Sequence, residues 1–353
     1  MFLFQQNYIK NSYVEKPISV NFAELNIFNV HVFFSGENSV INCSAVTVGT
    51  FDGIHRGHQH VIHYGITLAK EKKCSFVVYT FSPHPRKVLG ENTFKNILTQ
   101  QEKLYLFEQL GVDYVYVQTF TKEFSQKSAQ EFIKEHLLKQ LALHDLIIGY
   151  DHQFGKNREG SYDMLKEMAT EFHFHVHRVE AFYYHHLTIS STKIRNALEA
   201  GNIQQANEML GYPFFIHATV VNGMKLGRKL GFPTANLQID DEDKIIPATG
   251  VYAVLVEAEK IFYKGIASIS YRHSVDMSEH PLSVEVHLFD FNDEMYDKAV
   301  NVFFFDFIRS DIKFDSLDLL KHHISQDIEQ TKTLFIQYPE WLTIQNNLFL
   351  FNK

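Results

Sequence analysis

The stretch Gly49-Thr50-Phe51-Asp52-Gly53-Ile54-His55-Arg56-Gly57-His58 decides how the first half of this chain folds. It follows an apolar run at 45–48 and precedes a segment, 58–72, whose apolar side chains recur at helical spacing. We therefore expect it to join a buried strand to a helix. Its glycines let the backbone turn tightly, while the start of the helix offers free N–H groups and a positive dipole end, which suit a phosphate.

Strands and helices alternate outward from this stretch. Apolar patterning predicts, in chain order, strand 75–81, helix 100–110, strand 114–118, helix 128–141 and strand 146–148. Gly111 is the expected C-cap of the first of these helices, and Ser128 with Glu131 forms a capping box at the start of the second. The alternation predicts a doubly wound α/β domain with a parallel sheet, in which ligands bind beyond the carboxyl ends of the strands.

The pattern changes after about residue 212. Turns separate strand-like segments there at 215–221, 251–256, 261–268, 283–291 and 300–305, which predicts a β-barrel. Ser316 is the expected N-cap of a final helix that runs to residue 335. The predicted organisation is thus an α/β domain at 1–211, a barrel domain at 212–338 and a C-terminal tail at 339–353.

The bulk composition excludes several classes of protein. The 353 residues include 33 basic and 41 acidic ones, a net charge of −8, which disfavours nucleic-acid binding. No run approaches the ~18 apolar residues of a membrane span, and the N-terminus turns polar at Gln5, too early for a signal peptide. The expected location is the cytoplasm. Cys43 and Cys74 lack a Cys-x-x-Cys motif, so we expect reduced cysteines at strand starts rather than a disulfide or zinc site.

Two segments of the α/β domain have the chemistry of anion sites. His55 and His58 are three residues apart on one helical face, where both imidazoles could donate to the same phosphates. The hydroxyls of residues 190–192 precede a helix expected to start near Thr192, with Arg195 one turn in and able to fork onto a phosphate. Taken alone, the second segment fits a helix cap with a surface arginine equally well.

Two loops at expected strand ends are weaker candidates. In the loop 149–160, Asp151 can hold a hydroxyl-bearing ligand and Phe154 can stack on a ring. The turn 80–85 carries His84 between two prolines. Each loop, taken alone, is explained as well by an ordinary surface loop.

The barrel carries a basic glycine-rich loop that includes Gly223, Lys225, Gly227 and Arg228. Its spacing is wrong for a P-loop, but it suits a phosphate cradle. The Thr234 hydroxyl and the Asn236 carbonyl that follow are hard oxygen donors, suited to Mg²⁺. Glu285 shares the polar face of a strand with His287. A carboxylate there could deprotonate a hydroxyl nucleophile, although spacing alone does not distinguish it from a solvated face.

Together these motifs resemble the bacterial bifunctional riboflavin kinase/FMN adenylyltransferase family, also called FAD synthetase, over about residues 46–331. The resemblance implies a riboflavin kinase in the barrel and an FMN adenylyltransferase in the α/β domain. Riboflavin and ATP would give FMN, and FMN and ATP would give FAD and pyrophosphate, with Mg²⁺ as cofactor. The implied partners are these small molecules, without nucleic acid or membrane, and the expected state is a monomer or weak homo-oligomer.

The resemblance also assigns roles to individual residues. The adenylyltransferase ATP site would comprise Gly49, Phe51, Asp52, Gly53, His55, His58, Ser190, Ser191, Thr192 and Arg195, with His55, His58 and Arg195 catalytic. Flavin or nucleotide would contact His84, Asp151, Phe154 and Arg158. In the kinase, ATP would contact Gly223, Lys225, Gly227 and Arg228, Thr234 and Asn236 would hold the metal, and Glu285 would be the catalytic base.

The departures from the family pattern are concentrated in the barrel, where Asp311 is a mild one that stands in place of the usual Glu. The usual Asn-Ile-Gly-x-x-Pro-Thr is replaced at 268–274 by Ser-Ile-Ser-Tyr-Arg-His-Ser, and the usual Tyr-Gly by Tyr296-Asp297. They leave open an adenylyltransferase whose kinase domain only binds flavin. A flavin-binding regulator without turnover is a third hypothesis, which the intact His55, His58 and Arg195 oppose.

Overall fold

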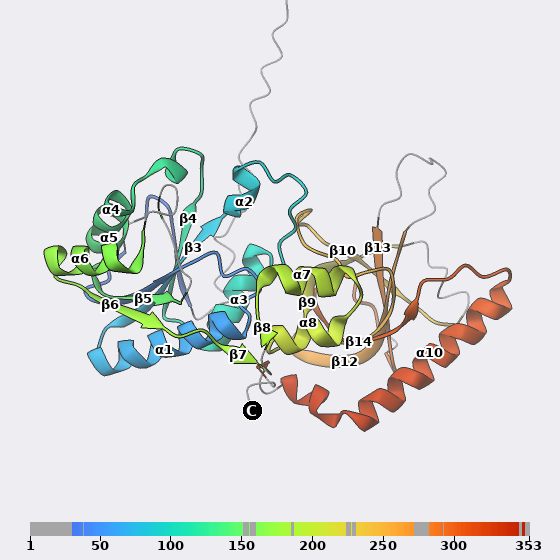
Figure 1. Ribbon diagram of the computed structural model, residues 1–353. Helices are drawn as coiled ribbons and strands as arrows, with labels where there is room; N and C mark the ends of the chain where they lie inside the picture. The colour runs from blue at the N-terminus through green and yellow to red at the C-terminus, as the bar shows by residue number, and fades with distance from the viewer. Residues whose placement is uncertain are drawn as a thin grey trace, which may run out of the picture.

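The computed structural model describes residues 30–37, 39–150, 155, 160–184, 187–223, 227, 231–271, 282–291, 293–345 and 348–349. Asp151, Phe154, Arg158, Lys225 and Arg228, all predicted above as site residues, lie outside this part of the chain. The molecule has two parts, an α/β domain and a barrel, with α7 and α8 between them and the long helix α10 along the barrel (Figure 1).

The α/β domain is built on a six-stranded parallel sheet in the order β1-β4-β3-β2-β5-β6. The strands are β1 (His31–Phe34), β2 (Ser44–Val48), β3 (Ser75–Ser82), β4 (Tyr114–Thr119), β5 (Leu143–Gly149) and β6 (His175–Val179). From β2 the chain runs outward through β3 to β4 and then returns to β5 on the other side of β2. The prediction of a doubly wound sheet is confirmed, and its switch point, where ligands bind in such sheets, lies between β2 and β5.

Helices cover both faces of this sheet. The helices of this domain are α1 (Arg56–Lys72), α2 (Pro85–Val88), α3 (Gln100–Leu110), α4 (Ala129–Phe132), α5 (Lys139–Leu141) and α6 (Tyr162–Phe172), with the 3₁₀ turn η2 (Phe124–Gln126) and the π-helical stretch η3 (Ile133–Leu138). On one face Ile62 of α1 joins a core with Phe76 and Val78, and on the other Phe132 joins Val77 and Tyr79. The alternation along β3 follows from the period of two in a strand.

Local sequence signals account for several helix ends. Gly111 caps α3 in the left-handed conformation, with φ +78°, as expected. Ser128 and Glu131 form the predicted capping box. The helix that they start is not continuous, because a π-helical stretch, η3, separates α4 from α5.

The barrel closes in the order β10-β13-β12-β11-β14-β9. Its strands are β9 (Phe215–Val221), β10 (Ala235–Gln238), β11 (Gly250–Ala258), β12 (Ile261–Tyr271), β13 (Leu282–Leu288) and β14 (Ala299–Ser310). Strand β10 was not predicted, because four residues that include Asn236 carry too little apolar alternation. Helix α10 (Leu317–Gln337) starts at Ser316 as expected. The hairpin β7 (Tyr183–Tyr184) and β8 (Leu187–Thr188), helices α7 (Ser191–Glu199) and α8 (Ile203–Leu210), and η5 (Pro339–Gln345) complete the fold.

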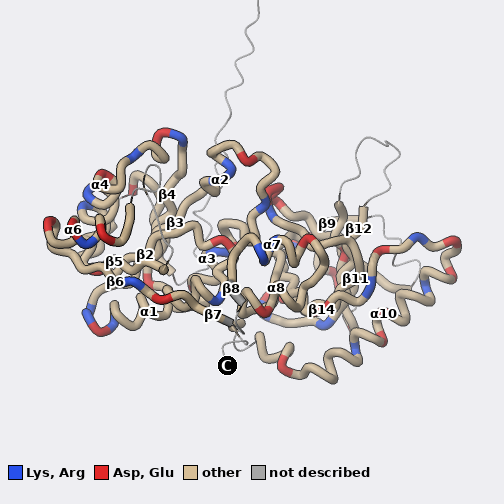
Figure 2. The backbone as a smooth tube through the Cα atoms, in the orientation of Figure 1, with Lys and Arg blue, Asp and Glu red and all other residues tan. Residues whose placement is uncertain are grey.

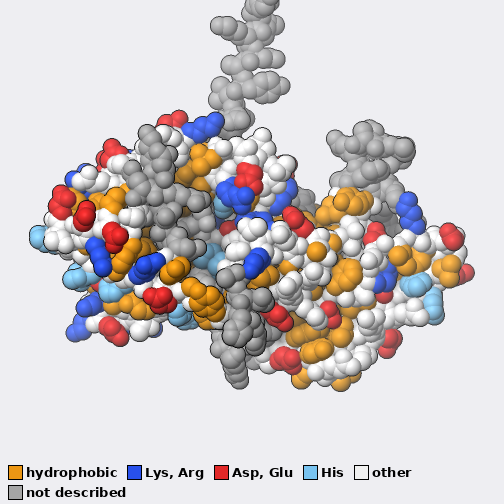
Figure 3. Space-filling model, in the orientation of Figure 1, with side chains coloured by type: hydrophobic (Ala, Val, Ile, Leu, Met, Phe, Trp, Pro, Cys, Tyr) orange, Lys and Arg blue, Asp and Glu red, His pale blue; other side chains and the backbone are white. Residues whose placement is uncertain are grey.

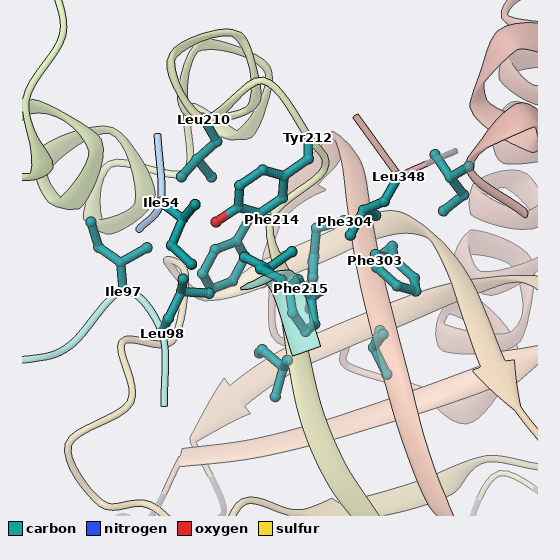
Figure 4. Close-up of a cluster of buried hydrophobic side chains, with 14 of the residues drawn as sticks. Ile54, Ile97, Leu98, Leu210, Tyr212, Phe214, Phe215, Phe303, Phe304 and Leu348 are labelled. Atoms are coloured by element: carbon teal, nitrogen blue, oxygen red, sulfur yellow. The ribbon is translucent and has the colours of Figure 1, made fainter. Parts of the chain in front are cut away.

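One apolar core runs from the α/β domain into the barrel. Figure 4 shows Ile54 and Leu98 packed close to Phe214, Phe215 and Phe304. The C-terminal tail returns to this junction, where Phe349 packs edge-on against Tyr212 at 5.7 Å between ring centroids. The two domains are therefore held by shared burial as well as by the chain that joins them.

The expectation of two reduced cysteines is wrong in this structure. Cys43 and Cys74 form a disulfide, with their Cα atoms 4.9 Å apart. They directly precede β2 and β3, which pair in parallel with Ser44 opposite Ser75. This proximity comes from strand pairing across 31 residues of sequence, which cysteine spacing does not show.

Candidate active sites

The start of α1 brings His55 and His58 together. His55 is the N-cap, and its Nδ1 accepts a hydrogen bond from the His58 backbone N–H at 3.4 Å. The two rings stack with centroids 3.7 Å apart and planes 13° from parallel. A Cβ at Gly57 would lie 3.3 Å from the His55 ring, so glycine gives this ring its place. Two imidazoles thus lie side by side at the positive end of a helix, beyond the carboxyl end of β2.

The loop between β2 and α1 has a strained backbone. Phe51 and Ile54 adopt φ of +47° and +35°, and Gly53 between them has φ +88°. The Tyr212 hydroxyl donates to the Gly53 carbonyl at 2.6 Å. Left-handed conformations at non-glycine residues persist where the surroundings enforce them, and they cluster at functional sites.

Asp52 organises the site rather than facing its opening. The residue is 3% exposed. Its Oδ1 accepts from the backbone N–H groups of Ile97 and Leu98 at 2.9 and 3.2 Å, and its Oδ2 accepts from Arg195 Nη2 at 2.5 Å. Its carbonyl accepts from the Ser191 hydroxyl at 2.8 Å. Asp52 therefore ties the segment 97–98 and the start of α7 to the loop after β2.

Arg195 is held by three separate contacts. Besides Asp52, its Nε donates to the Lys95 carbonyl at 2.9 Å, and its guanidinium lies over the Phe94 ring at 4.3 Å. These two hydrogen bonds use two of the five N–H groups of the guanidinium, which can donate others to a ligand. A buried arginine fixed in this way is pre-organised to bind an anion.

His84 packs on the same Phe94 ring, stacked at 4.3 Å between centroids. Its Nδ1 accepts from the Arg86 N–H at 3.2 Å, which caps α2. Burial, reinforced by the cations Lys103, Arg195 and Arg86, lowers the pKa of His84 to about 3. His84 is therefore a neutral imidazole near neutral pH.

Two residues at this site were missed from the sequence. Phe94 packs against both His84 and Arg195, but an isolated phenylalanine before a helix gives no sequence signal. Lys103 is buried in α3, where burial lowers its pKa to about 8 although Asp52 and Asp241 oppose the shift. A lysine on an apolar helical face is a signal that sequence reading could have used.

The hydroxyl segment opens a helix near Thr192, as predicted. Helix α7 starts at Ser191, and Ser190 is its N-cap, accepting from the Lys193 N–H at 3.3 Å. The Ser191 hydroxyl donates a hydrogen bond to the Asp52 carbonyl, and Thr192 is exposed. The segment is brought to the β2–α1 loop, as predicted, although two of its hydroxyls serve the protein itself.

A lysine of the barrel domain reaches into the α/β domain. Lys244 is fully buried, and its Nζ donates to Glu102 Oε2 at 2.6 Å and to the carbonyls of Ile97 and Phe215 at 2.7 and 2.9 Å. Nearby, Ile245 N–H donates to the Asn96 carbonyl at 2.8 Å. The barrel domain therefore holds the same segment that Asp52 binds.

The predicted kinase residues also meet. Thr234 Oγ1 donates to Glu285 Oε2 at 3.1 Å, and Asn236 lies directly opposite Glu285 in the β10–β13 ladder. Val284, Val286 and Leu288 point into the barrel, which leaves half-buried Glu285 and His287 on its outer face.

The glycines of the barrel loop make room for Thr234 and Asn236. A Cβ at Gly223 would lie 1.9 Å from Asn236 Nδ2, and one at Gly227 would lie 2.3 Å from the Phe232 carbonyl and 3.1 Å from Thr234 Oγ1. Neither position accepts a side chain without moving its neighbour. Glycine spacing predicted a phosphate cradle here. What the structure shows at Gly223 and Gly227 is that the backbone comes close to Asn236 and Thr234.

The chain matches two family models, described as FAD synthetase over residues 38–193 and riboflavin kinase over 210–335. The bifunctional riboflavin kinase/FMN adenylyltransferase of Haemophilus influenzae is 37% identical over 84% of this chain and 96% of its own. That of Listeria monocytogenes is 35% identical over 89% and 99%. The chain belongs to this bifunctional family.

A crystal structure from Streptococcus pneumoniae, named a macrolide-efflux protein, shares this architecture. It superimposes with a TM-score of 0.77 at 32% identity and covers 86% of this chain and 99% of its own. The efflux name describes the Streptococcus protein, whereas the two family models decide the family here. Among the described residues, no helix has the length and apolar character to span a membrane.

The family accounts for both sites, so the chain is a riboflavin kinase and an FMN adenylyltransferase. The alternative of a kinase domain that only binds flavin is not favoured, because relatives named for both activities match across both domains.

The departures from the family pattern can be placed in part. Ser270 lies in regular β12 pairing opposite Ser283, a position that needs no glycine. Asp297 has a φ of +61°, in the left-handed region. The glycine that the family usually has at this position suits such a backbone, and aspartate tolerates it. His273 and Ser274 lie outside the described residues.

Two cavities flank the kinase residues. One of about 330 Å³ opens beside Thr234 and is lined by Pro233, Phe291, Asp293 and Tyr296 among others. The other, of about 320 Å³, lies between β13 and α10, with Phe232, His287, Phe289, Ser325 and Lys332 in its wall.

Proposed function

We propose that His55, His58 and Arg195 bind the ATP phosphates during adenylyl transfer to FMN. The FMN phosphate is already anionic, so this reaction needs no general base. It needs positively charged protein groups beside the α-phosphate and beside the leaving pyrophosphate, where they stabilise the negative charge that develops. The observation that carries the proposal is the stacked histidine pair at the start of α1, at the switch point of the sheet and beside a pre-organised arginine.

Other predicted ATP-site residues would act through these three. Asp52 would position Arg195, because both of its carboxylate oxygens are taken up by protein donors. Gly49, Phe51 and Gly53 would shape the loop, and Ser190 and Ser191 would fix the start of α7, leaving Thr192 to face the ligand. A neutral His84 would take part in hydrogen bonds without adding charge.

For the kinase, we propose that Glu285 accepts the proton of the ribityl hydroxyl of riboflavin. The cavity between β13 and α10 begins at His287, on the same outer face of β13, so the flavin ring would occupy it with the ribityl chain directed to Glu285. Thr234 and Asn236 would hold Mg²⁺, which fits their hard oxygen donors. When bound, the ion would neutralise charge on the ATP phosphates.

The remaining assignments stay predictions. Asp151, Phe154 and Arg158 are proposed for the flavin or nucleotide of the adenylyltransferase, and Lys225 and Arg228 for the kinase phosphates. We propose the domain limits 1–211 and 212–338, with 339–353 as a tail. The matches of the two family models to residues 38–193 and 210–335 support the first two.

We also propose that the partners are small molecules alone and that the protein is a monomer or weak homo-oligomer. Figure 2 shows acidic residues interspersed with basic ones along both domains, and the face drawn in Figure 3 also carries both charges. This mixture of charges supports the absence of a nucleic-acid partner. Both reactions consume ATP, which supports work in the cytoplasm.

Chromatography of flavin products tests these roles. Wild-type protein should make FMN from riboflavin and FAD from FMN, each with ATP and Mg²⁺. His58→Ala should lower FAD formation at least ~100-fold and leave FMN formation within twofold. Glu285→Gln should do the reverse. His60→Ala and Glu259→Gln, at exposed positions of α1 and the barrel, are the matched controls. Loss of both products in either test variant would remove the two-site assignment.

A further inference from the structure

Cys43, Cys74 and His144 lie together at the amino-terminal edge of the parallel sheet, whereas the adenylyltransferase site lies beyond the carboxyl ends of its strands. The two cysteines precede β2 and β3, and His144 is the second residue of β5, on the other side of β2. Their potential ligand atoms all lie within 4.8 Å of one another. Neither reaction uses these residues.

The backbone of β5 is irregular at His144. Ser44 of β2 pairs with Leu143, whereas the next residue, Ala45, pairs with Asp145. His144 is therefore an extra residue without a partner in this ladder, which is a β-bulge. Bulges re-aim a side chain, and here the side chain lies beside the two sulfur atoms.

A buried carboxylate fixes the His144 ring. Asp145 is fully buried and accepts from His144 Nδ1 at 2.6 Å and from His177 Nε2 at 2.7 Å. A carboxylate that lies between two imidazole nitrogens at these distances is the acceptor of both hydrogen bonds. His144 Nδ1 then carries a proton, and Nε2 carries the lone pair that a metal requires. A carboxylate behind a ligating histidine is the usual support of protein metal sites.

We propose that Cys43, Cys74 and His144 form a Zn²⁺ site when the disulfide between the two cysteines is reduced. Two thiolates and an imidazole are the ligand types that zinc prefers, and three protein ligands leave a fourth tetrahedral position for water. Bonds of ~2.0–2.3 Å give tetrahedral edges of roughly 3.5–4 Å, which a spread within 4.8 Å accommodates. All three residues are half-buried, so the ion has a path from solvent.

Neither the reduction of the disulfide nor the binding of Zn²⁺ that follows requires a substrate of the enzyme. An external phosphine with water reduces the disulfide to two thiols and leaves as the phosphine oxide. Zn²⁺ then displaces the two thiol protons to solvent, so its affinity rises with pH. In a reducing compartment the thiol form, and with it the metal site, is the one expected.

Zinc uptake by the full-length protein tests the proposal. The protein is reduced with a phosphine, desalted without oxygen, titrated with Zn²⁺ against a chromophoric chelator, and its metal content is measured by mass spectrometry. We expect one Zn²⁺ per chain more in the reduced wild type than in the oxidised protein. Cys74→Ser should remove this ion, and His144→Asn should weaken its binding at least ~10-fold.

His175→Asn is the matched control, because this exposed histidine lies next to His144, with ring centroids 5.3 Å apart, but is not one of the three candidate ligands. It should bind Zn²⁺ as the wild type does. Adenylyl transfer should be unchanged in His144→Asn, which shows that this variant is folded. Equal zinc uptake by reduced wild type and Cys74→Ser would overturn the proposal, as would unchanged affinity in His144→Asn or a disulfide that resists reduction.

Discussion

The two active sites are held in different ways. In the α/β domain, Arg195 and the loop after β2 are fixed by hydrogen bonds to Asp52, the segment 95–98 and Tyr212. In the barrel, Thr234 donates a hydrogen bond to Glu285, Asn236 lies opposite Glu285 in the β10–β13 ladder, and two glycines pack closely against Thr234 and Asn236. The first site has its charges in place before a ligand arrives, whereas the second brings together the residues that we propose as a base and as two ligands for an ion.

This difference follows the chemistry. Adenylyl transfer to FMN requires pre-organised positive charge and no proton transfer, so a rigid network serves it. The kinase needs a carboxylate that can accept a proton and oxygen ligands that can rearrange around Mg²⁺. The connection between the sites is structural, because Lys244 of the barrel domain holds the segment on which the first site depends.

The largest expected effect is on this connection. Lys244→Met leaves Glu102 buried without its cation and should lower the free energy of unfolding by about 3–5 kcal/mol, measured by urea denaturation. FAD formation should fall further than FMN formation, because the segment 97–98 loses its support. Adding Glu102→Gln to the same variant should recover most of the stability. A double variant as unstable as the single one would show that the ion pair is not the cause.

Arg195→Lys tests the rigid site directly. Lysine cannot reproduce the planar contacts with Asp52, Lys95 and Phe94, so FAD formation should fall ~100-fold or more, with FMN formation unchanged. Arg86→Lys is the control, since Arg86 also lies over Phe94 but is exposed and paired with Glu91. Similar losses in both variants would attribute the effect to Phe94 packing rather than to the ligand.

Gly223→Ala probes the barrel site. The added Cβ must displace the Asn236 amide, so the Mg²⁺ concentration needed for half-maximal FMN formation should rise about 10-fold, which is ~1.4 kcal/mol of binding free energy. FAD formation in the same preparation is the internal control. An unchanged Mg²⁺ requirement would exclude Asn236 as a ligand.

The last effect concerns pH. The pKa of His84, about 3, lies below its unfolded value of 6.5, so its contribution to stability is complete above pH 6.5 and is lost as pH falls toward 3. His84→Asn keeps an N-cap but removes this titration, so its stability should fall less steeply below pH 6.5. Parallel curves for variant and wild type from pH 6.5 to 4 would contradict the assignment.

The sequence by itself determined the type of each domain. Strand–helix alternation around Gly49–His58 predicted the doubly wound sheet, and capping signals such as Ser128–Glu131 and Ser316 mark helix ends because they act within a single turn. It also singled out Thr234, Asn236 and Glu285 as candidates, since residue type carries the chemistry proposed for them.

Only the tertiary structure decided how these residues are held. Asp52 and Arg195 are 143 residues apart, Lys244 and Glu102 are 142 apart, and Cys43 joins Cys74 through parallel strand pairing. Such contacts depend on which strands and domains pack together, which a local pattern does not encode. The prediction placed Asp52 against ATP, whereas the structure shows that it binds Arg195. A local pattern could not show this contact either.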